Sequence, residues 1–473
     1  MAPAPPTPSQ LPPPMSVLLS ALVAAAPPAA HGAAGGTPVG GALFGGGLPF
    51  PLLISLTALA FLGTLVSSRI AISLRLPAVL GVLVLGLLLH PGQKVLSLMQ
   101  VENLHVVSLS MLLFCAGLNA ELQHLRGFLR YGVLLAVGGV LLTTLVFTPL
   151  LWGIHAAVAA LWPALGVVAL PVPVALMAAA CVSCTDAMAT LEVLRRAGLH
   201  LPQRLHALVE MEASLNDPLA IVFLMLVVSL ASAGWLHPQG GGDPAALLPA
   251  LQSFLKSIGS GVMVGLILSF VAQFILRRFV SSPSQILLLG IAVALSSYGL
   301  AQLLQGSGFI SAYVTGLFLA NDIYANRWIT PEQLENSLEP FNTLTEFSVF
   351  LLFGTLIEPA SIATAFVPGI LSALALILIA RPVSVLALQP FSPFGRREGV
   401  MLAWCGLRGA VPLALAYTAI HAIPALPGLG EEQVVALEHQ LQGLIFLVVV
   451  GNLCLQGLSL PPLCRRLGLA EAH

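Results

Sequence analysis

Residues 209–230 read "VEMEASLNDPLAIVFLMLVVSL". Two glutamates and an aspartate open this stretch, and the rest is long and apolar enough to lie within a bilayer, whose core takes roughly 20 apolar residues per helix. The whole chain has the same character: 58% of its 473 residues are apolar and only 8% are charged. Such a composition excludes a soluble globular domain. It predicts an all-α polytopic membrane protein.

About thirteen segments of membrane-spanning character are predicted, each bounded by Pro, Gly or charged residues. They centre near residues 58, 83, 111, 142, 181, 219, 266, 293, 313, 349, 371, 411 and 447. The stretch 156–193 is broken at "LPVPV", so the segment near 181 is the least regular of them.

The positions of Lys and Arg orient these segments, because basic residues collect in the cytoplasmic loops of membrane proteins. Only Lys94 and Lys256 fall on the opposite side from the main basic group. That group comprises Arg69, Arg75, Arg126, Arg130, Arg195, Arg196, Arg204, Arg277, Arg278, Arg327, Arg396, Arg397, Arg465 and Arg466. We therefore expect a multi-pass protein of the cell (inner) membrane with its N-terminus outside and its C-terminus in the cytoplasm.

The chain ends flank one membrane domain, predicted over residues 49–468. Residues 1–48 are a low-complexity Pro, Ala and Gly segment, read as a cleaved signal, a disordered external tail, or a stretch preceding a start at Met15. Residues 469–473 form a short cytoplasmic tail. The "CVSC" motif at residues 181–184 is read as small buried side chains rather than as a metal site, since no second Cys or His pair accompanies it.

Three acidic and two basic side chains fall at bilayer depth in the predicted segments. The acids are Asp186, Glu212 and Asp217, and the bases are Arg381 and Arg408. Because buried charges in a membrane are costly, we expect the arginines to pair with acids. Three acids against two bases leave one negative charge, which a single proton or monovalent cation neutralises. This balance favours one-for-one exchange.

Helical spacing separates the carboxylates of the opening stretch. Asp217 shares a helix face with Ala213, Ser214 and Glu210, whereas Glu212 lies on the face of Asn216. Glu210 is read either as an access residue that draws cations inward or as a solvated helix end.

Two segments contain helix-breaking sequences. "VSCTDAMATL", residues 182–191, places Thr and Asp inside an apolar run, and "GLRGAVP", residues 406–412, places two Gly and a Pro there. Transporters with inverted repeats use such interrupted helices at the membrane midplane. Asp186 beside a half-helix N-terminus and Arg408 beside a C-terminus would complement the helix dipoles.

Six motifs then occur in an order that resembles the cation:proton antiporter-1 family, which includes the NhaP-type sodium/proton exchangers. They are "TDAMATLEVL", "EASLNDPLAIVF", "GSGFISAYVTGLFLAN", "FLLFGTLIEP", "LIARPVSV" and "GLRGAVPLALA". The resemblance implies two inverted six-helix repeats with interrupted helices, an elevator-type antiporter fold and a homodimer.

The resemblance also implies roles for individual residues. Asp217 is expected to bind the cation and the proton, and Asn216 stands where electrogenic relatives have a second Asp, which implies electroneutral exchange. Thr185 would line the site at the helix break. Two ion pairs are implied, Glu212 with Arg381 and Asp186 with Arg408.

Two positions depart from the family pattern. Cys115 in "LLFCAGL" stands where an acid is common, and Ala213 stands where a Ser is common. Both changes remove oxygen atoms that suit hard monovalent cations. Ser214 or water are the candidate replacements, or else the ion is a larger one, such as K⁺.

The resulting prediction is an electroneutral antiporter that exchanges one monovalent cation, Na⁺, K⁺ or Li⁺, for one proton and contributes to pH homeostasis. The alternatives are a cation-coupled symporter of an organic anion and a non-transporting membrane scaffold or sensor. No enzymatic motif is present, and no cofactor, nucleic-acid partner or metal other than the transported cation is expected.

Overall fold

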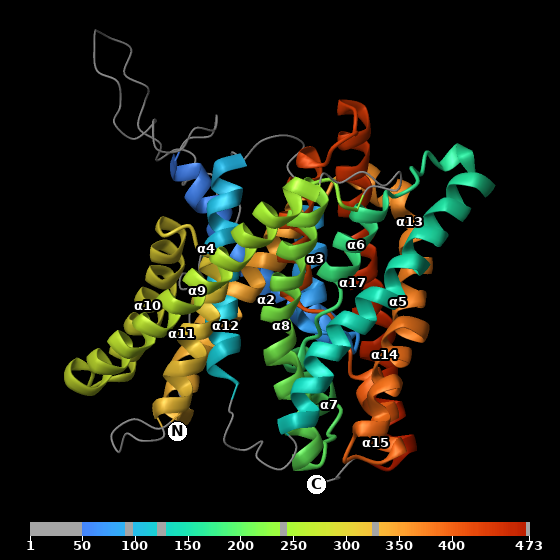
Figure 1. Cartoon of the computed structure of the whole chain (residues 1–473). Coiled ribbons are helices and arrows are strands. Elements are labelled where there is room, and N and C mark those ends of the chain that lie inside the picture. Colours follow the sequence, from blue (N-terminus) through green and yellow to red (C-terminus); the bar gives the residue numbers. More distant parts are fainter. Residues whose placement is uncertain (1–49, 90–97, 121–128, 237–243, 324–330, 470–473) are drawn as a thin grey trace, which may run out of the picture. The chain divides into compact units, whose positions relative to one another are not determined.

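The computed structural model describes residues 50–89, 98–120, 129–236, 244–323 and 331–469, and these form a bundle of helices (Figure 1). The predicted segment 1–48 and all but Leu469 of the predicted tail lie outside the described residues. The α-helices are α2 (Phe50–Ser73), α3 (Ala78–Leu88), α4 (Leu98–Leu118), α5 (Leu129–Leu161), α6 (Val172–Cys181), α7 (Ala187–Arg196), α8 (Gln203–Ser232), α9 (Pro244–Phe279), α10 (Pro283–Leu303), α11 (Gly308–Ile323), α12 (Pro331–Leu356), α13 (Pro359–Ala375), α14 (Arg381–Leu388), α15 (Arg396–Trp404), α16 (Ala410–Ala422) and α17 (Glu431–Leu467).

Short turns of other helix types join some of these elements. They are η3 (Pro163–Leu165), η5 (Gln389–Phe391) and η6 (Ile423–Ala425), which are 3₁₀ turns, and η4 (Leu376–Ala380), which is a π-helical turn between α13 and α14. Such π turns are rare and occur preferentially at functional sites. This one directly precedes Arg381.

The helices have the length and composition that a bilayer requires. Among the described residues, six are long and apolar enough to cross a membrane: Leu129–Leu161, Gln203–Ser232, Leu247–Phe279, Pro283–Leu303, Pro359–Phe391 and Glu431–Leu467. Shorter apolar helices accompany them. Each predicted segment centre falls within a described helix, so the all-α membrane character is confirmed, while the number of crossings stays a prediction.

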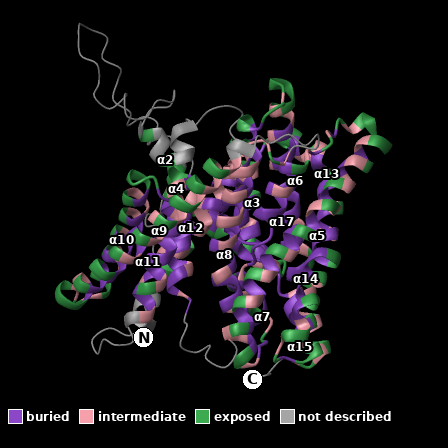
Figure 2. Ribbon diagram, viewed as in Figure 1, coloured by how far each residue is buried: buried purple, intermediate pink, exposed green. Residues whose placement is uncertain are grey.

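Burial differs between the faces of these helices (Figure 2). On α9, Phe270 and Phe274 are each 65% exposed, whereas Ala272 between them is fully buried. Large apolar side chains on the outside of a bundle are what a lipid environment favours, because lipid tails, unlike water, do not exclude them.

Glycines bring neighbouring helices into close contact. A Cβ atom at Gly117 of α4 would lie 2.3 Å from the backbone oxygen of Tyr313 in α11, and one at Gly316 would lie 2.1 Å from that of Phe114. The pair Gly86 and Gly354 does the same between α3 and α12. Small residues at such crossings allow backbones to approach, which is how membrane helices gain packing energy.

Two apolar clusters make up the described core. The first surrounds the interrupted helices α6–α7 and α15–α16 together with α8. The second lies among α4, α9, α10, α11 and α12. Helices α4, α11 and α12 contribute residues to both clusters, so they form the boundary between the two parts of the bundle.

The breaks expected from the sequence are present. Helix α5 ends at Leu161, and α6 begins at Val172 inside "LPVPV" with Pro173 in its first turn, where proline's missing amide hydrogen costs nothing. Helix α6 then ends at Cys181 and α7 starts at Ala187, while α15 ends at Trp404 and α16 starts at Ala410. The predicted interrupted helices are therefore confirmed.

Helix ends rich in arginine meet at one end of the bundle. Arg465 at the end of α17 donates a hydrogen bond of 3.2 Å to the backbone oxygen of Ala197, just after α7. Arg204 at the start of α8 lies 5.4 Å from the centre of the Phe394 ring, just before α15. These ends were assigned to the same side by the distribution of Arg residues, and their proximity agrees with that assignment. Which side of the membrane they face stays a prediction.

Candidate functional site

The two interrupted helices touch each other at their breaks. The backbone N–H of Asp186, before α7, donates a 2.7 Å hydrogen bond to the oxygen of Leu407, between α15 and α16. A Cβ atom at Gly409 would lie only 2.0 Å from Oδ2 of Asp186, so this position has room for no side chain. The breaks thus form a single crossing in which the ends of four half-helices come together.

Charged side chains stabilise the half-helix ends at this crossing. Asp186 is the N-cap of α7, and its Oδ1 accepts a 2.9 Å hydrogen bond from the N–H of Ala189. Arg408 is completely buried and donates to the carbonyl oxygens of Ser183, at 2.8 Å, and Cys184, just beyond the end of α6. A carboxylate at a helix N-terminus and a cation at a C-terminus both oppose the helix dipole favourably.

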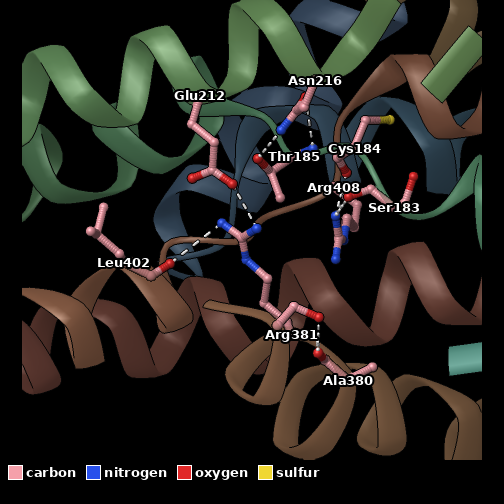
Figure 3. A network of polar contacts seen from close by, with 10 residues as sticks. Ser183, Cys184, Thr185, Glu212, Asn216, Ala380, Arg381, Leu402 and Arg408 are labelled. Atoms are coloured by element: carbon pink, nitrogen blue, oxygen red, sulfur yellow. Dashed lines mark hydrogen bonds and ion pairs between the residues drawn. The ribbon is translucent and has the colours of Figure 1, made fainter. Parts of the chain in front are cut away.

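Arg408 and Asp186 do not form the expected ion pair within the described residues. The carbonyls that follow α6 lack intrahelical partners, and the guanidinium of Arg408 satisfies two of them instead (Figure 3). Asp186 directs its carboxylate toward the first turn of α7. Each side chain therefore completes a helix end rather than neutralising the other.

Glu212 and Arg381 do form the expected pair. Nη1 of Arg381 lies 2.6 Å from Oε1 of Glu212, and the two side chains are 2% and 3% exposed. Nη2 of Arg381 donates a 3.5 Å hydrogen bond to the oxygen of Leu402. Glycines border the pair, since a Cβ atom at Gly406 would approach Nε of Arg381 to 3.3 Å and one at Gly139 would approach Nη1 to 3.6 Å. Figure 3 shows the pair on α8 and α14.

Asn216 connects α8 to the break between α6 and α7. Its Nδ2 donates a 2.7 Å hydrogen bond to Oγ1 of Thr185, and its Oδ1 accepts one of 3.3 Å from the Thr185 N–H. Both residues are buried. The structure thus brings the predicted site residues Thr185 and Asn216 together (Figure 3).

Asp217 differs from its neighbours on α8 because it is half-buried and has no ion-pair partner among the described residues. The Cys184 thiol lies within hydrogen-bonding reach of its carboxylate, and Asp186 lies close enough for the two charges to interact. Ser214, one turn earlier, is buried and makes no side-chain hydrogen bond within the described residues. Asp217 is therefore the carboxylate left open to a ligand.

Two side chains near the acidic residues of the site were not identified as site residues from the sequence. Tyr313 of α11 lies within electrostatic range of Asp217, and Glu346 of α12 lies within such range of Asp186 and Glu192. Both come from helices remote in sequence. A hydroxyl in the apolar motif "GSGFISAYVTGLFLAN" was the available signal for Tyr313.

Two other sequence positions make different contacts. Glu210 is 43% exposed and pairs with His206 at 3.3 Å, as expected for a solvated helix end. Cys115 is buried in the second apolar cluster, with Met111 and Phe114 of its own helix. An apolar environment therefore surrounds the position at which the family pattern has an acid.

The sequence is similar to those of known cation/proton antiporters. The family model for the sodium/hydrogen exchanger transmembrane region matches residues 56–466. The K⁺/H⁺ antiporter NhaP2 of Shewanella oneidensis is 32% identical over 61% of this chain and 46% of its own length. The K⁺/H⁺ antiporter NhaP of Alkalimonas amylolytica is 28% identical over 87% of this chain and 65% of its own length. The Na⁺/H⁺ antiporter NhaH of Halobacillus aidingensis is 29% identical over 64% of this chain.

The fold has a counterpart among solved structures. That of the sodium proton antiporter MjNhaP1 from Methanocaldococcus jannaschii superposes with a TM-score of 0.73 at 21% identity, covering 88% of this chain and 99% of that one. The first curated relatives are longer, and the match spans about half of their length. With a family model that covers most of the chain, the protein belongs to the sodium/hydrogen exchanger family.

Proposed function

We propose that this protein is an electroneutral antiporter that exchanges one monovalent cation, Na⁺ or K⁺, for one proton at Asp217. The reaction class is supported by the relatives, which are named K⁺/H⁺ and Na⁺/H⁺ antiporters. We also propose that it is a homodimer in the cell membrane, with Na⁺, K⁺ or Li⁺ and H⁺ as substrates.

The observation that carries this proposal is the unequal pairing of the charges around the crossing. Glu212 is held by Arg381, and Arg408 is held by backbone carbonyls. Asp217 has a half-buried carboxylate, a carboxylate neighbour in Asp186 and no cationic partner among the described residues. It is the position at which adding one positive charge removes repulsion.

The exchange follows from the cost of moving an uncompensated charge through a membrane interior. With a proton or a monovalent cation on Asp217, the three acids and two arginines sum to neutrality, because −3 and +2 leave −1 and the ligand supplies +1. The empty site keeps its negative charge and resists crossing. Cation and proton therefore alternate on the same oxygens.

The structure suggests which parts would move. The interrupted helices and α8 are joined by Asn216–Thr185 and Glu212–Arg381, whereas the clustered buried residues of α9 and α10 belong to the second cluster. We propose an elevator motion in which the first group carries Asp217 past the second. The boundary formed by α4, α11 and α12 is the surface along which the two groups would slide.

Proteoliposomes containing a pH-sensitive dye test the proposal. We expect Na⁺, K⁺ or Li⁺ added to the outside to collapse an imposed proton gradient with the wild-type protein, and the Asp217→Asn variant to lack this activity while retaining the wild-type elution profile. If none of the three ions collapses the gradient with the wild type, or if Asp217→Asn exchanges at the wild-type rate, the proposal is wrong.

Asn216 tests the stoichiometry. With Asn216 neutral, the exchange rate should be insensitive to an imposed membrane potential. The Asn216→Asp variant adds a carboxylate that can still accept the hydrogen bond from the Thr185 N–H, although it loses the one that Asn216 donates to Oγ1, so any exchange it retains should depend on the potential. A wild-type rate that changes with the potential would contradict electroneutral exchange.

A further inference from the structure

Tyr313 has a buried hydroxyl for which the fold provides no partner. Its side chain is 5% exposed, and its hydroxyl oxygen makes no hydrogen bond within the described residues. A hydroxyl removed from water without a partner costs free energy, and a phenylalanine of the same shape would avoid that cost. A buried hydroxyl at this position is therefore best explained by a ligand that binds it in only some states of the protein.

The surroundings identify where that partner lies. Helix α11, which carries Tyr313, packs against α8, which carries Asp217, and the two side chains lie close enough to interact electrostatically. Asp217 is half-buried, so its carboxylate remains reachable next to this hydroxyl. The two groups come from different parts of the bundle, α8 and α11.

Helix α11 is fixed from two sides, which holds the Tyr313 ring in place. Gly117 of α4 packs on the backbone oxygen of Tyr313 itself. On the other side, Gly265 of α9 packs on the oxygen of Ser311 and accepts a 3.2 Å hydrogen bond from Oγ1 of Thr315. A side chain on so tightly packed a backbone presents its hydroxyl at a defined position, as a binding site requires.

The site has a use for this hydroxyl. A monovalent cation at Asp217 needs several oxygen atoms, and on the same helix face Ser214 offers a hydroxyl whereas Ala213 offers none. Thr185 at the helix break already accepts a hydrogen bond from Asn216. A phenolic oxygen has two acceptor lone pairs and one O–H donor. It can coordinate a cation, and it can hydrogen-bond with the carboxyl group when Asp217 carries a proton instead.

We infer that the Tyr313 hydroxyl is an oxygen ligand of the monovalent cation bound at Asp217, supplied by α11 in place of the hydroxyl that Ala213 lacks. This inference rests on the proposed exchange at Asp217. It assigns part of the cation site to the helix group that we propose stays in place, so the ligand set is complete only when α8 faces α11.

The Tyr313→Phe variant tests the inference, because it removes one oxygen and keeps the ring. We expect the apparent KM for the preferred cation to rise by about three- to tenfold, the effect of losing one net polar contact, with the maximal rate within about twofold of wild type. The matched control is Tyr298→Phe on α10, where the phenol accepts a 2.9 Å hydrogen bond from Gln302 away from the site. Its KM should equal that of the wild type.

A second variant places the missing hydroxyl elsewhere. Adding Ala213→Ser to Tyr313→Phe restores an oxygen on the Asp217 face of α8 and should bring KM back toward the wild-type value. Cation-dependent thermal stabilisation of the purified protein in detergent, measured with Na⁺, K⁺ and Li⁺ separately, should follow the same order of variants. This second measurement requires no transport.

The outcomes separate the two proposals. If the wild type exchanges cations for protons and Tyr313→Phe keeps the wild-type KM for all three ions, the inference is overturned and the proposed function stands. A loss confined to the maximal rate likewise overturns it. If the wild type itself exchanges none of the ions, the proposed function fails first.

Discussion

Glu212 and Asp217 lie on the same helix, but different side chains surround their carboxylates. Glu212 is closed off by Arg381, which reaches it from α14 at 2.6 Å. Asp217 faces the thiol of Cys184 and the carboxylate of Asp186, with Tyr313 near by. The difference arises from the helices that pack against each residue and not from α8 itself. It teaches that a membrane carboxylate becomes a structural or an exchangeable group according to which side chains its neighbours supply.

Breaking the Glu212–Arg381 ion pair should give the largest change in stability. Glu212→Gln leaves the Arg381 guanidinium buried without a counter-charge, and we expect the free energy of unfolding to fall by about 3–5 kcal/mol. Asp217→Asn strands no cation and should leave the free energy of unfolding at or above the wild-type value. Thermal or denaturant unfolding in detergent measures both variants.

A double variant controls for the loss of Glu212. Combining Glu212→Gln with Arg381→Met removes both charges, and because an apolar replacement of a buried pair is often neutral, most of the stability should return. Equal stabilities for Glu212→Gln and Asp217→Asn would show that the two carboxylates do not differ in the way we describe.

Adding a single methyl group at Gly409, where the two helix breaks cross, should lower stability and activity. In Gly409→Ala, the new Cβ meets Oδ2 of Asp186 at 2.0 Å, so the carboxylate must leave the first turn of α7. We expect a loss of about 1–3 kcal/mol in stability, typical of overpacking, and a slower exchange rate. Gly259→Ala on α9 is the matched control, because no atom lies within 4 Å of its added Cβ. A wild-type exchange rate and stability for Gly409→Ala would contradict the close contact.

The smallest effects are expected for the acids outside the crossing. Glu210 is 43% exposed, so Glu210→Gln should change stability by less than about 0.5 kcal/mol and exchange by less than about twofold. Glu346 is half-buried and within electrostatic range of Asp186, so Glu346→Gln should raise the apparent KM for the cation more than Glu210→Gln does. The reverse order, measured in the same proteoliposome assay, would make Glu210 the access residue.

Much of the site was predictable because its signals are local. The helix breaks follow from Thr, Asp, Gly and Pro inside apolar segments, and the pairing of Glu212 with Arg381 follows from the cost of buried charge together with the family resemblance. The partner of Arg408 was predicted incorrectly. The family resemblance assigned it to Asp186, whereas carbonyl oxygens beyond the end of α6 bind it instead. The helix-dipole argument had placed Arg408 beside a half-helix C-terminus, and that placement is confirmed.

The sequence by itself determined that this chain is a helical membrane protein, where its helices break, and that one carboxylate on α8 exceeds the available arginines. These properties depend on composition and on spacing along a single helix. Only the tertiary structure decided that Asp217 lies beside Cys184 and within electrostatic range of Tyr313, that Cys115 packs in the second apolar cluster, and that Asp186 touches Gly409. Such contacts join helices remote in the sequence, and whether they form depends on how glycines let those helices pack.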